Sequence, residues 1–147
     1  MEQCDAVRLS RAGWQKARLV VADDTAIFRR ALVRQLQVLG MEALGVGTPE
    51  ELQRCLGEDP PDAVLLDWHF GGRTAESVLD LLRARWIPVI VLTGNPEGIG
   101  ATGVPVLGKP VDLELLRVQL AAVLAGSGST SAGEGRGRAD GSRPRDA

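Results

Sequence analysis

The sequence predicts a doubly wound α/β fold built on a five-stranded parallel sheet. Short apolar segments alternate with amphipathic helical patterns along most of the chain. The third and fourth apolar segments, residues 62–67 and 87–92, are almost continuously apolar, which is typical of parallel strands covered on both faces. We therefore expect helices to cover both faces of the sheet.

Five apolar segments are the expected strands. They are residues 17–22, 41–46, 62–67, 87–92 and 104–107. The fifth contains Pro105, and proline cannot donate a hydrogen bond to a neighbouring strand. An edge position is therefore expected for the fifth strand.

Helical patterns lie between these strands. Residues 28–39 carry apolar side chains at spacings of four, four and three, and Gly40 ends this helix. The run Thr48-Pro49-Glu50-Glu51 is a capping box with proline at the first helical position, which predicts a second helix to about residue 56. Two further helices are expected over residues 74–85 and, capped by an aspartate, over 112–124. Trp86, just after the third helix, is expected to pack against the body of the protein.

The connection between the fourth and fifth strands breaks this alternation. Its eleven residues, 94–104, include four glycines and one proline. This composition disfavours a helix by several kcal/mol, and a crossover between parallel strands normally needs a dozen residues or more. We therefore expect the fourth helix to be missing or shortened to one turn.

Composition and charge describe one ordinary folded domain. The chain has 147 residues, 44% of them hydrophobic, and a net charge of −2, so nothing indicates binding to nucleic acid or to a membrane surface. No apolar run approaches a membrane span, and the first residues lack the apolar core of a signal peptide. Cys4 and Cys55 have no metal-binding or redox spacing, so we expect reduced thiols and a cytoplasmic protein.

The two ends of the chain differ from its middle. Residues 126–147 contain six Gly and four Ser but no Val, Ile, Leu, Met, Phe or Trp. Such a segment cannot offset its ordering entropy by burial, so it is expected to be a disordered tail. Residues 1–16 form a leader that is either unstructured or an additional helix, and residues 17–125 form the folded domain.

Polar side chains stand where four of the strands end. Asp23 and Asp24 follow the first strand, Asp67 ends the third, Thr93 follows the fourth and Lys109 follows the fifth. Open α/β sheets bind ligands and perform chemistry at the carboxyl ends of their strands. These five side chains are therefore expected to surround one cleft.

The chemistry of this cleft follows from its residue types. Three neighbouring carboxylates cannot all stay ionised without a counter-charge, so one must protonate or a cation must enter. Oxygen ligands without a histidine pair or cysteine cluster suit Mg²⁺ or Mn²⁺ rather than Zn²⁺. The hydroxyl of Thr93 and the ammonium of Lys109 suit phosphoryl oxygens. Together these groups are the equipment for an acyl phosphate on Asp67.

In this order and at these strand ends, the residues resemble the receiver domain of two-component response regulators. The resemblance covers residues 17–125 and rests on Asp23-Asp24, Asp67, Thr93 and Lys109-Pro110. It implies a flavodoxin-like sheet with the strand order 2-1-3-4-5. It also implies a phosphoprotein of signal transduction and phosphorelay, phosphorylated by a sensor histidine kinase or a histidine phosphotransfer protein, and not an enzyme with its own turnover.

The resemblance also assigns roles to the site residues. Asp67 would be the phosphoacceptor, and Asp24 would bind the metal, with Asp23 contributing directly or through water. Asp67 and the backbone carbonyl of His69 would complete the protein ligands of the metal.

Thr93 would donate a hydrogen bond to one phosphoryl oxygen, and Lys109 would pair with another. The Lys109–Pro110 peptide is expected to be cis, a state that only proline readily permits. No output domain follows in the sequence, so the expected action is partner binding or service as a phosphate sink or shuttle. No nucleic acid or membrane partner is expected, and the oligomeric state stays open, a homodimer included.

Two departures from the receiver pattern leave a second hypothesis open. Receivers usually place an aromatic switch residue three positions before the lysine, where this chain has Val106. They also use the fourth helix for output, and that helix is expected to be reduced here. The alternative is a receiver-like interaction module that works without phosphorylation.

A third hypothesis is a Mg²⁺-dependent phosphatase of the haloacid-dehalogenase type. Those enzymes use an Asp-x-Asp pattern after the first strand, whereas Asp23 and Asp24 are adjacent here. The sequence also shows no cap domain, so we disfavour this hypothesis.

Overall fold

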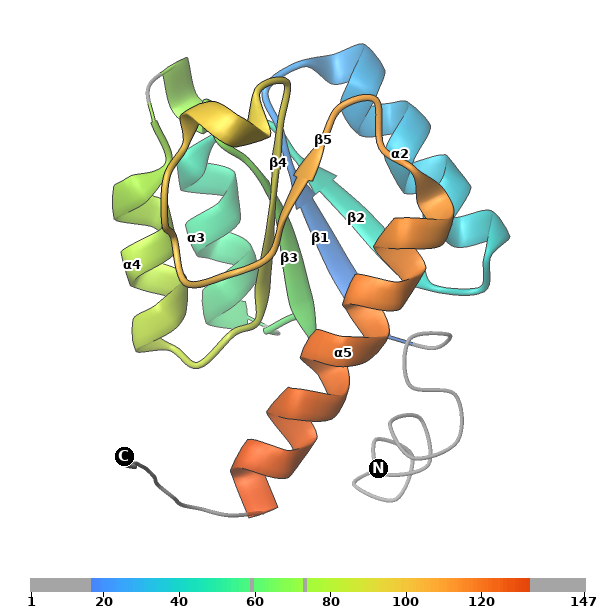
Figure 1. Ribbon diagram of the computed structural model, residues 1–147, viewed down its shortest axis with the longest axis vertical. Helices are drawn as coiled ribbons and strands as arrows, with labels where there is room; N and C mark the ends of the chain where they lie inside the picture. Colours follow the sequence, from blue (N-terminus) through green and yellow to red (C-terminus); the bar gives the residue numbers. More distant parts are fainter. Residues whose placement is uncertain (1–16, 59, 73, 133–147) are drawn as a thin grey trace.

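The computed structural model describes residues 17–58, 60–72 and 74–132 and shows a parallel sheet with helices on both faces (Figure 1). The sheet has five strands in the order β2-β1-β3-β4-β5, and all four neighbouring pairs are parallel. The predicted doubly wound fold and strand order are confirmed. The predictions made for residues 1–16, and for the tail from residue 133 onward, lie outside the described residues.

The strands are short, and burial follows their place in the sheet. Their bounds are β1 Arg18–Ala22, β2 Glu42–Val46, β3 Ala63–Asp67, β4 Val89–Thr93 and β5 Val106–Gly108. All residues of β3 and β4 are buried, as expected of central strands covered on both faces, whereas β2 at one edge is only partly buried. The predicted edge position of the fifth strand is confirmed, and Pro105 lies just before it, accepting a hydrogen bond from the Val91 N–H.

Two pairs of helices enclose the sheet. Helices α2 (Ala26–Val38) and α5 (Leu113–Ala132) cover one face, and helices α3 (Pro49–Glu58) and α4 (Glu76–Ala84) cover the other (Figure 1). A short 3₁₀ helix, η2 (Phe70–Gly72), follows β3. The N-terminus of α3 shows half of the predicted capping box, since the Glu51 N–H donates to the Thr48 hydroxyl, while the Glu51 carboxylate accepts the N–H of Gly47 instead of that of Thr48.

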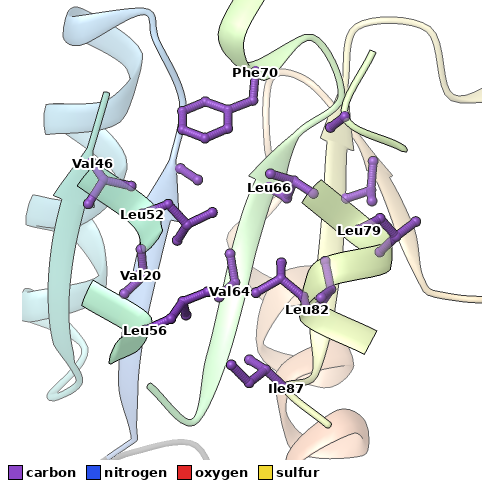
Figure 2. Packing of buried hydrophobic residues seen from close by; sticks show 14 of the residues in the cluster. Val20, Val46, Leu52, Leu56, Val64, Leu66, Phe70, Leu79, Leu82 and Ile87 are labelled. Carbon is purple, nitrogen blue, oxygen red and sulfur yellow. The ribbon is translucent and has the colours of Figure 1, made fainter. Parts of the chain in front are cut away.

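Each face has its own hydrophobic core. Under α3 and α4, leucines of both helices pack on the valines and leucines of β1 and β3, and Phe70 closes this core near the carboxyl ends of the strands (Figure 2). Under α2 and α5, Leu32, Leu36, Leu116 and Leu120 pack on the opposite side chains of the same strands. The two cores fix the strands, and with them the positions of the polar residues at the strand ends.

The connection between β4 and β5 contains only the three-residue 3₁₀ helix η3 (Pro96–Gly98). The expected loss of the fourth helix of the fold is confirmed; the label α4 here belongs to the helix between β3 and β4. The rest of the connection runs beside α4, where Ile99 and Val104 pack against the core (Figure 1). Gly100 and Gly103 have φ of 85° and 80°, which favours glycine at both positions.

Two expectations differ from the structure. Helix α5 continues through Gly126 to Ala132, so the helix ends later than the composition of residues 126–147 predicts. Trp86 does not pack: it is 80% exposed and has a φ of 61°. The reason lies in the end of α4, because the N–H groups of Trp86 and Ile87 bond back to the helix carbonyls; Trp86 thus takes the left-handed position and Ile87 enters the core.

None of the helices in the described residues is both long and apolar enough to span a membrane.

Candidate functional site

Four strand ends bring the predicted site residues to one edge of the sheet. Asp23 directly follows β1, Asp67 and Thr93 are the last residues of β3 and β4, and Lys109 directly follows β5. Asp23, Asp67 and Thr93 are the buried polar residues of the described chain, with exposed fractions of 1%, 6% and 2%. Burial of a charged group is unfavourable unless it is paired, so each of these side chains requires partners.

The three aspartates form a compact cluster of oxygen ligands. Asp23, Asp24 and Asp67 each offer one carboxylate oxygen, and these oxygens all lie within 4.8 Å of one another. Asp23 and Asp67 are buried, whereas Asp24 is exposed, so the cluster is open to solvent on the side of Asp24. Within the described residues this is the group of acidic, histidine and cysteine side chains that could hold a metal ion. Its oxygen-only donor set fits a hard divalent cation.

Lys109 supplies the counter-charge that three neighbouring carboxylates require. Its Nζ donates to Asp23 Oδ2 at 2.9 Å and to Asp67 Oδ1 at 3.1 Å. Burial by itself lowers the pKa of Lys109, but the hydrogen bonds to Asp23 and Asp67 and their negative charges outweigh it and hold this pKa above its ordinary value of 10.5. Lys109 is therefore a fully charged ammonium at neutral pH, placed between two buried carboxylates.

Backbone groups hold the two buried aspartates in place. The Thr25 N–H donates to Asp23 Oδ1 at 2.8 Å, and the His69 N–H donates to Asp67 Oδ1 at 3.4 Å. The His69 carbonyl, the expected fourth metal ligand, accepts the Gly72 N–H at 3.1 Å. A carbonyl oxygen has two lone pairs, so one remains for a cation. The residues present thus fit a divalent cation.

Thr93 joins the ends of β4 and β5. Its carbonyl accepts the Lys109 N–H at 2.8 Å, and its hydroxyl oxygen accepts the Asn95 N–H at 3.2 Å. The hydroxyl keeps its own proton for donation, so it can still bond an incoming anionic oxygen. The Lys109–Pro110 peptide that follows is cis, as predicted.

Two side chains of α2 belong to the site although their patterns did not indicate it. The ring of Phe28 lies 4.3 Å from Lys109 Nζ, a cation–π contact that covers the ammonium on its apolar side. Arg29 Nη1 donates to the Asp23 carbonyl at 2.7 Å. From the sequence, Phe28 is expected to be one of the apolar residues on the buried face of a helix, and Arg29 is expected to be solvated. The sequence feature that could have indicated a role in the site is their position just after Asp24, in the first turns of this helix.

Val106 occupies the position at which receivers usually place the aromatic switch residue. Val106 is half-buried and packs against the core under α3 and α4 together with Ile99 and Val104. An aliphatic side chain that forms part of a core has little freedom to swing between two positions.

Comparisons with known proteins agree with this architecture. No protein-family model matches the sequence. The chain is 34% identical over 99 residues to the sensory/regulatory protein RpfC of Xanthomonas campestris, a match that covers 62% of this chain but only 14% of that protein. The chain thus spans a small part of the length of the curated relatives that it matches.

Solved structures show the same fold. A receiver domain of a Francisella response regulator superposes with a TM-score of 0.64 at 18% identity, covering 76% of this chain and 99% of that one. The signal receiver domain of an HD domain-containing protein from Pseudomonas fluorescens gives a TM-score of 0.68 at 19% identity, covering 78% and 98%. Fold and site define a doubly wound α/β protein with an acid–lysine site at the carboxyl ends of its strands. The fold is that of response regulator receiver domains, and the resemblance predicted from the motifs is confirmed.

Proposed function

We propose that this protein is a cytoplasmic phosphoacceptor that receives a phosphoryl group on Asp67 from a histidine kinase or a histidine phosphotransfer protein, with Mg²⁺ bound beside it. The receiver fold supports a phosphoaccepting role in general terms. The observation that carries the proposal is the bridge from Lys109 to Asp23 and Asp67, because it places one cation between the proposed metal ligand and the proposed nucleophile. The phosphorylated protein would act on a partner or serve as a phosphate sink or shuttle.

The transfer uses the groups at this edge of the sheet. An oxygen of Asp67 forms a bond to phosphorus while the bond from phosphorus to the donor imidazole nitrogen breaks, and the electron pair of that bond returns to the imidazole. Lys109 stabilises the negative charge on one phosphoryl oxygen, and the Thr93 hydroxyl donates to another. The metal, held by Asp23, Asp24, Asp67 and the His69 carbonyl, would supply charge neutralisation of the phosphoryl group.

Phosphorylation by a small donor tests the proposal directly. The protein is incubated with acetyl phosphate and Mg²⁺, and the intact mass is measured over time. We expect the added mass of one phosphoryl group on the wild type and none on Asp67→Ala. Asp80→Ala is the matched control, because Asp80 is an exposed acid on α4, away from the strand ends. An unlabelled wild type, or equal labelling of Asp67→Ala, would refute the transfer role.

A second candidate function is that of an interaction module independent of phosphorylation. The packed Val106 and the three-residue η3 favour it, because the aromatic switch and the helix used for output in receivers are both changed. It predicts that the affinity for a binding partner is the same with and without beryllofluoride, a phosphoryl mimic. A change in affinity on adding beryllofluoride would exclude it.

We further propose that the site receives phosphate without catalysing turnover. A haloacid-dehalogenase phosphatase has an Asp-x-Asp pattern after the first strand, whereas Asp23 and Asp24 are adjacent after β1 in this chain. Hydrolysis of p-nitrophenyl phosphate beyond one equivalent, lost in Asp23→Asn, would overturn this part of the proposal.

A further inference from the structure

An arginine-lined groove lies between α2 and the edge strand β2, outside the acid cluster. It has a volume of about 600 Å³. This size falls within the range of small-molecule sites and exceeds the needs of one phosphate ion. Its lining residues are Arg29, Arg30, Ala31, Val33, Arg34, Gln37 and Gly45.

The groove concentrates positive charge in a protein whose net charge is −2. Three of its seven lining residues are arginines and none is acidic. Among the ion pairs of the described part of the chain, none involves Arg29, Arg30 or Arg34. Three neighbouring guanidinium groups repel one another, so an anion that enters the groove relieves this repulsion.

Arg29 is held against the floor of the groove. A Cβ added to Gly45 would lie 2.9 Å from the Arg29 Cγ, and one added to Gly47 would lie 2.9 Å from its Nη1. The glycines therefore let the arginine lie flat across the end of β2. Its Nη1 also donates to the Asp23 carbonyl. A guanidinium fixed in this way loses little entropy on binding a ligand.

We propose that this groove binds an oligophosphate, a small molecule with two or more linked phosphate groups. Arg30 and Arg34 are one helical turn apart, so their Cβ atoms are about 6 Å from each other, and guanidinium forks match phosphate oxygens in pairs. Linked phosphates concentrate several negative charges on neighbouring groups, and long arginine side chains can converge on them from one face of the helix. Carboxylates on alternate residues of an extended peptide lie roughly 7 Å apart, so an acidic peptide presents a lower density of charge.

Recognition in the groove rests on the phosphates themselves. Its lining contains no aromatic side chain on which a nucleobase would stack. Free oligophosphate and nucleoside triphosphate share the chemistry that the arginines read, and the experiment below separates these two sources. This binding does not depend on phosphorylation of Asp67, so it can succeed or fail independently of the proposed function.

Calorimetric titration with tripolyphosphate and with ATP, in EDTA and about 0.15 M salt, tests the site. Without metal, the aspartate cluster repels phosphates and does not contribute. We expect saturable 1:1 binding that weakens about tenfold in Arg30→Ala and in Arg34→Ala, because each loses a charge-assisted hydrogen bond. Both residues are exposed, so the fold should persist, as circular dichroism would verify.

Arg54→Ala is the matched control, since Arg54 is an exposed arginine of α3 on the opposite face of the sheet. Gly45→Ala provides an independent variant, which displaces Arg29 and should weaken binding without removing a charge. Equal affinities for the two probes would identify phosphate recognition alone, and tighter binding of ATP would identify a nucleotide. The proposal would be overturned if neither probe showed saturable binding, or if Arg54→Ala weakened binding as much as Arg30→Ala and Arg34→Ala do. It would also be overturned if a hexaglutamate peptide bound more tightly than tripolyphosphate.

Discussion

The acid–lysine site and the β4–β5 connection lie at neighbouring strand ends but are built in opposite ways. At the site, buried carboxylates are paired with one ammonium and with backbone N–H groups. In the connection, residues 94–98 are all exposed and only η3 stands where the resemblance places a helix. The residues proposed for phosphoryl transfer and the connection in the place of the output helix are thus separate parts of this fold, and only the first part follows the receiver pattern.

The largest expected effect is on the rate of phosphorylation, which should fall when the site is changed but not when the connection is changed. Lys109→Met removes the cation that would stabilise the phosphoryl oxygens, and such a loss lowers a rate on the order of a hundredfold. Val106→Ala changes the end of the connection but no group at the phosphoryl position, so its rate should stay within about twofold of wild type. Intact-mass time courses with acetyl phosphate and Mg²⁺ measure both rates.

Arg85→Met controls for the loss of a positive charge, because Arg85 is an exposed residue just after α4. Similar losses of rate in Lys109→Met and Val106→Ala would show that the connection takes part in the chemistry. The separation of the two regions would then be wrong.

Metal binding should stabilise the site region and depend on its acids. A Mg²⁺ concentration a hundredfold above the dissociation constant raises the free energy of unfolding by about 2.7 kcal/mol if only the folded state binds. Urea denaturation with Mg²⁺ and with EDTA measures this difference. Asp24→Asn should remove most of it, because it takes one of the three clustered carboxylates from the ion.

Asp80→Asn is the matched control, because Asp80 is an exposed acid of α4 whose ion pair with Arg83 is long, at 4.0 Å. Asp112→Asn would be less suitable, because Asp112 caps α5 and its loss would destabilise that helix. A Mg²⁺ stabilisation that persists in Asp24→Asn would place the ion elsewhere.

A smaller effect is expected from the backbone of the connection. Gly103 has a φ of 80°, so Gly103→Ala should lower the free energy of unfolding by roughly 1 kcal/mol. The added Cβ would come within 2.7 Å of Arg83 Nη2, but that atom ends a flexible side chain and can move away. Gly94→Ala is the matched control in the same connection, because a Cβ there meets no atom within 4 Å. Phosphorylation of both variants should equal that of wild type, and a slower Gly103→Ala would link the connection to the site.

Much of the fold was predictable because burial on both faces leaves a simple pattern. Strands β3 and β4 read as continuous apolar runs, and the glycines of the connection correctly predicted the loss of a helix. Strand bounds were less predictable near prolines: β4 begins after Pro88 and β5 after Pro105, each two residues later than the apolar run. The carbonyls of both prolines still accept hydrogen bonds from the neighbouring strand. The hydrogen bonding of the sheet therefore begins before the residues that are assigned to the strands.

The site was predictable as a set of residues but not as a set of contacts. Parallel strands bring their carboxyl ends together, which places Asp23, Asp67 and Lys109 at one edge without further information. The direction of the Lys109 side chain, between both acids and over Phe28, depends on tertiary packing that no local pattern contains. The same holds for Arg29, whose side chain lies against Gly45 in β2 and Gly47 just after this strand.

The smallest expected effect is a pH dependence that belongs to the site alone. The pKa of Lys109 lies above 10.5 in the folded protein because its bonds to Asp23 and Asp67 outweigh the burial that lowers it. The stabilisation from its charge is therefore complete below pH 10.5 and is lost as the pH rises through the higher folded pKa. The difference in the free energy of unfolding between wild type and Lys109→Met should therefore be constant at lower pH and shrink as the pH rises above about 10.5.

The composition of the chain leaves few other side chains that titrate in the same pH range as Lys109. There is no tyrosine, and the only lysines are Lys16 and Lys109. Lys16→Met therefore removes the only other lysine of the chain and isolates the contribution of Lys109. Gly103→Ala leaves the ammonium in place and should lower stability by the same amount at every pH. If the difference in the free energy of unfolding between wild type and Lys109→Met were also the same at every pH, the loss of Lys109 would act through packing and not through its charge. The site and the connection would then not differ in their electrostatics.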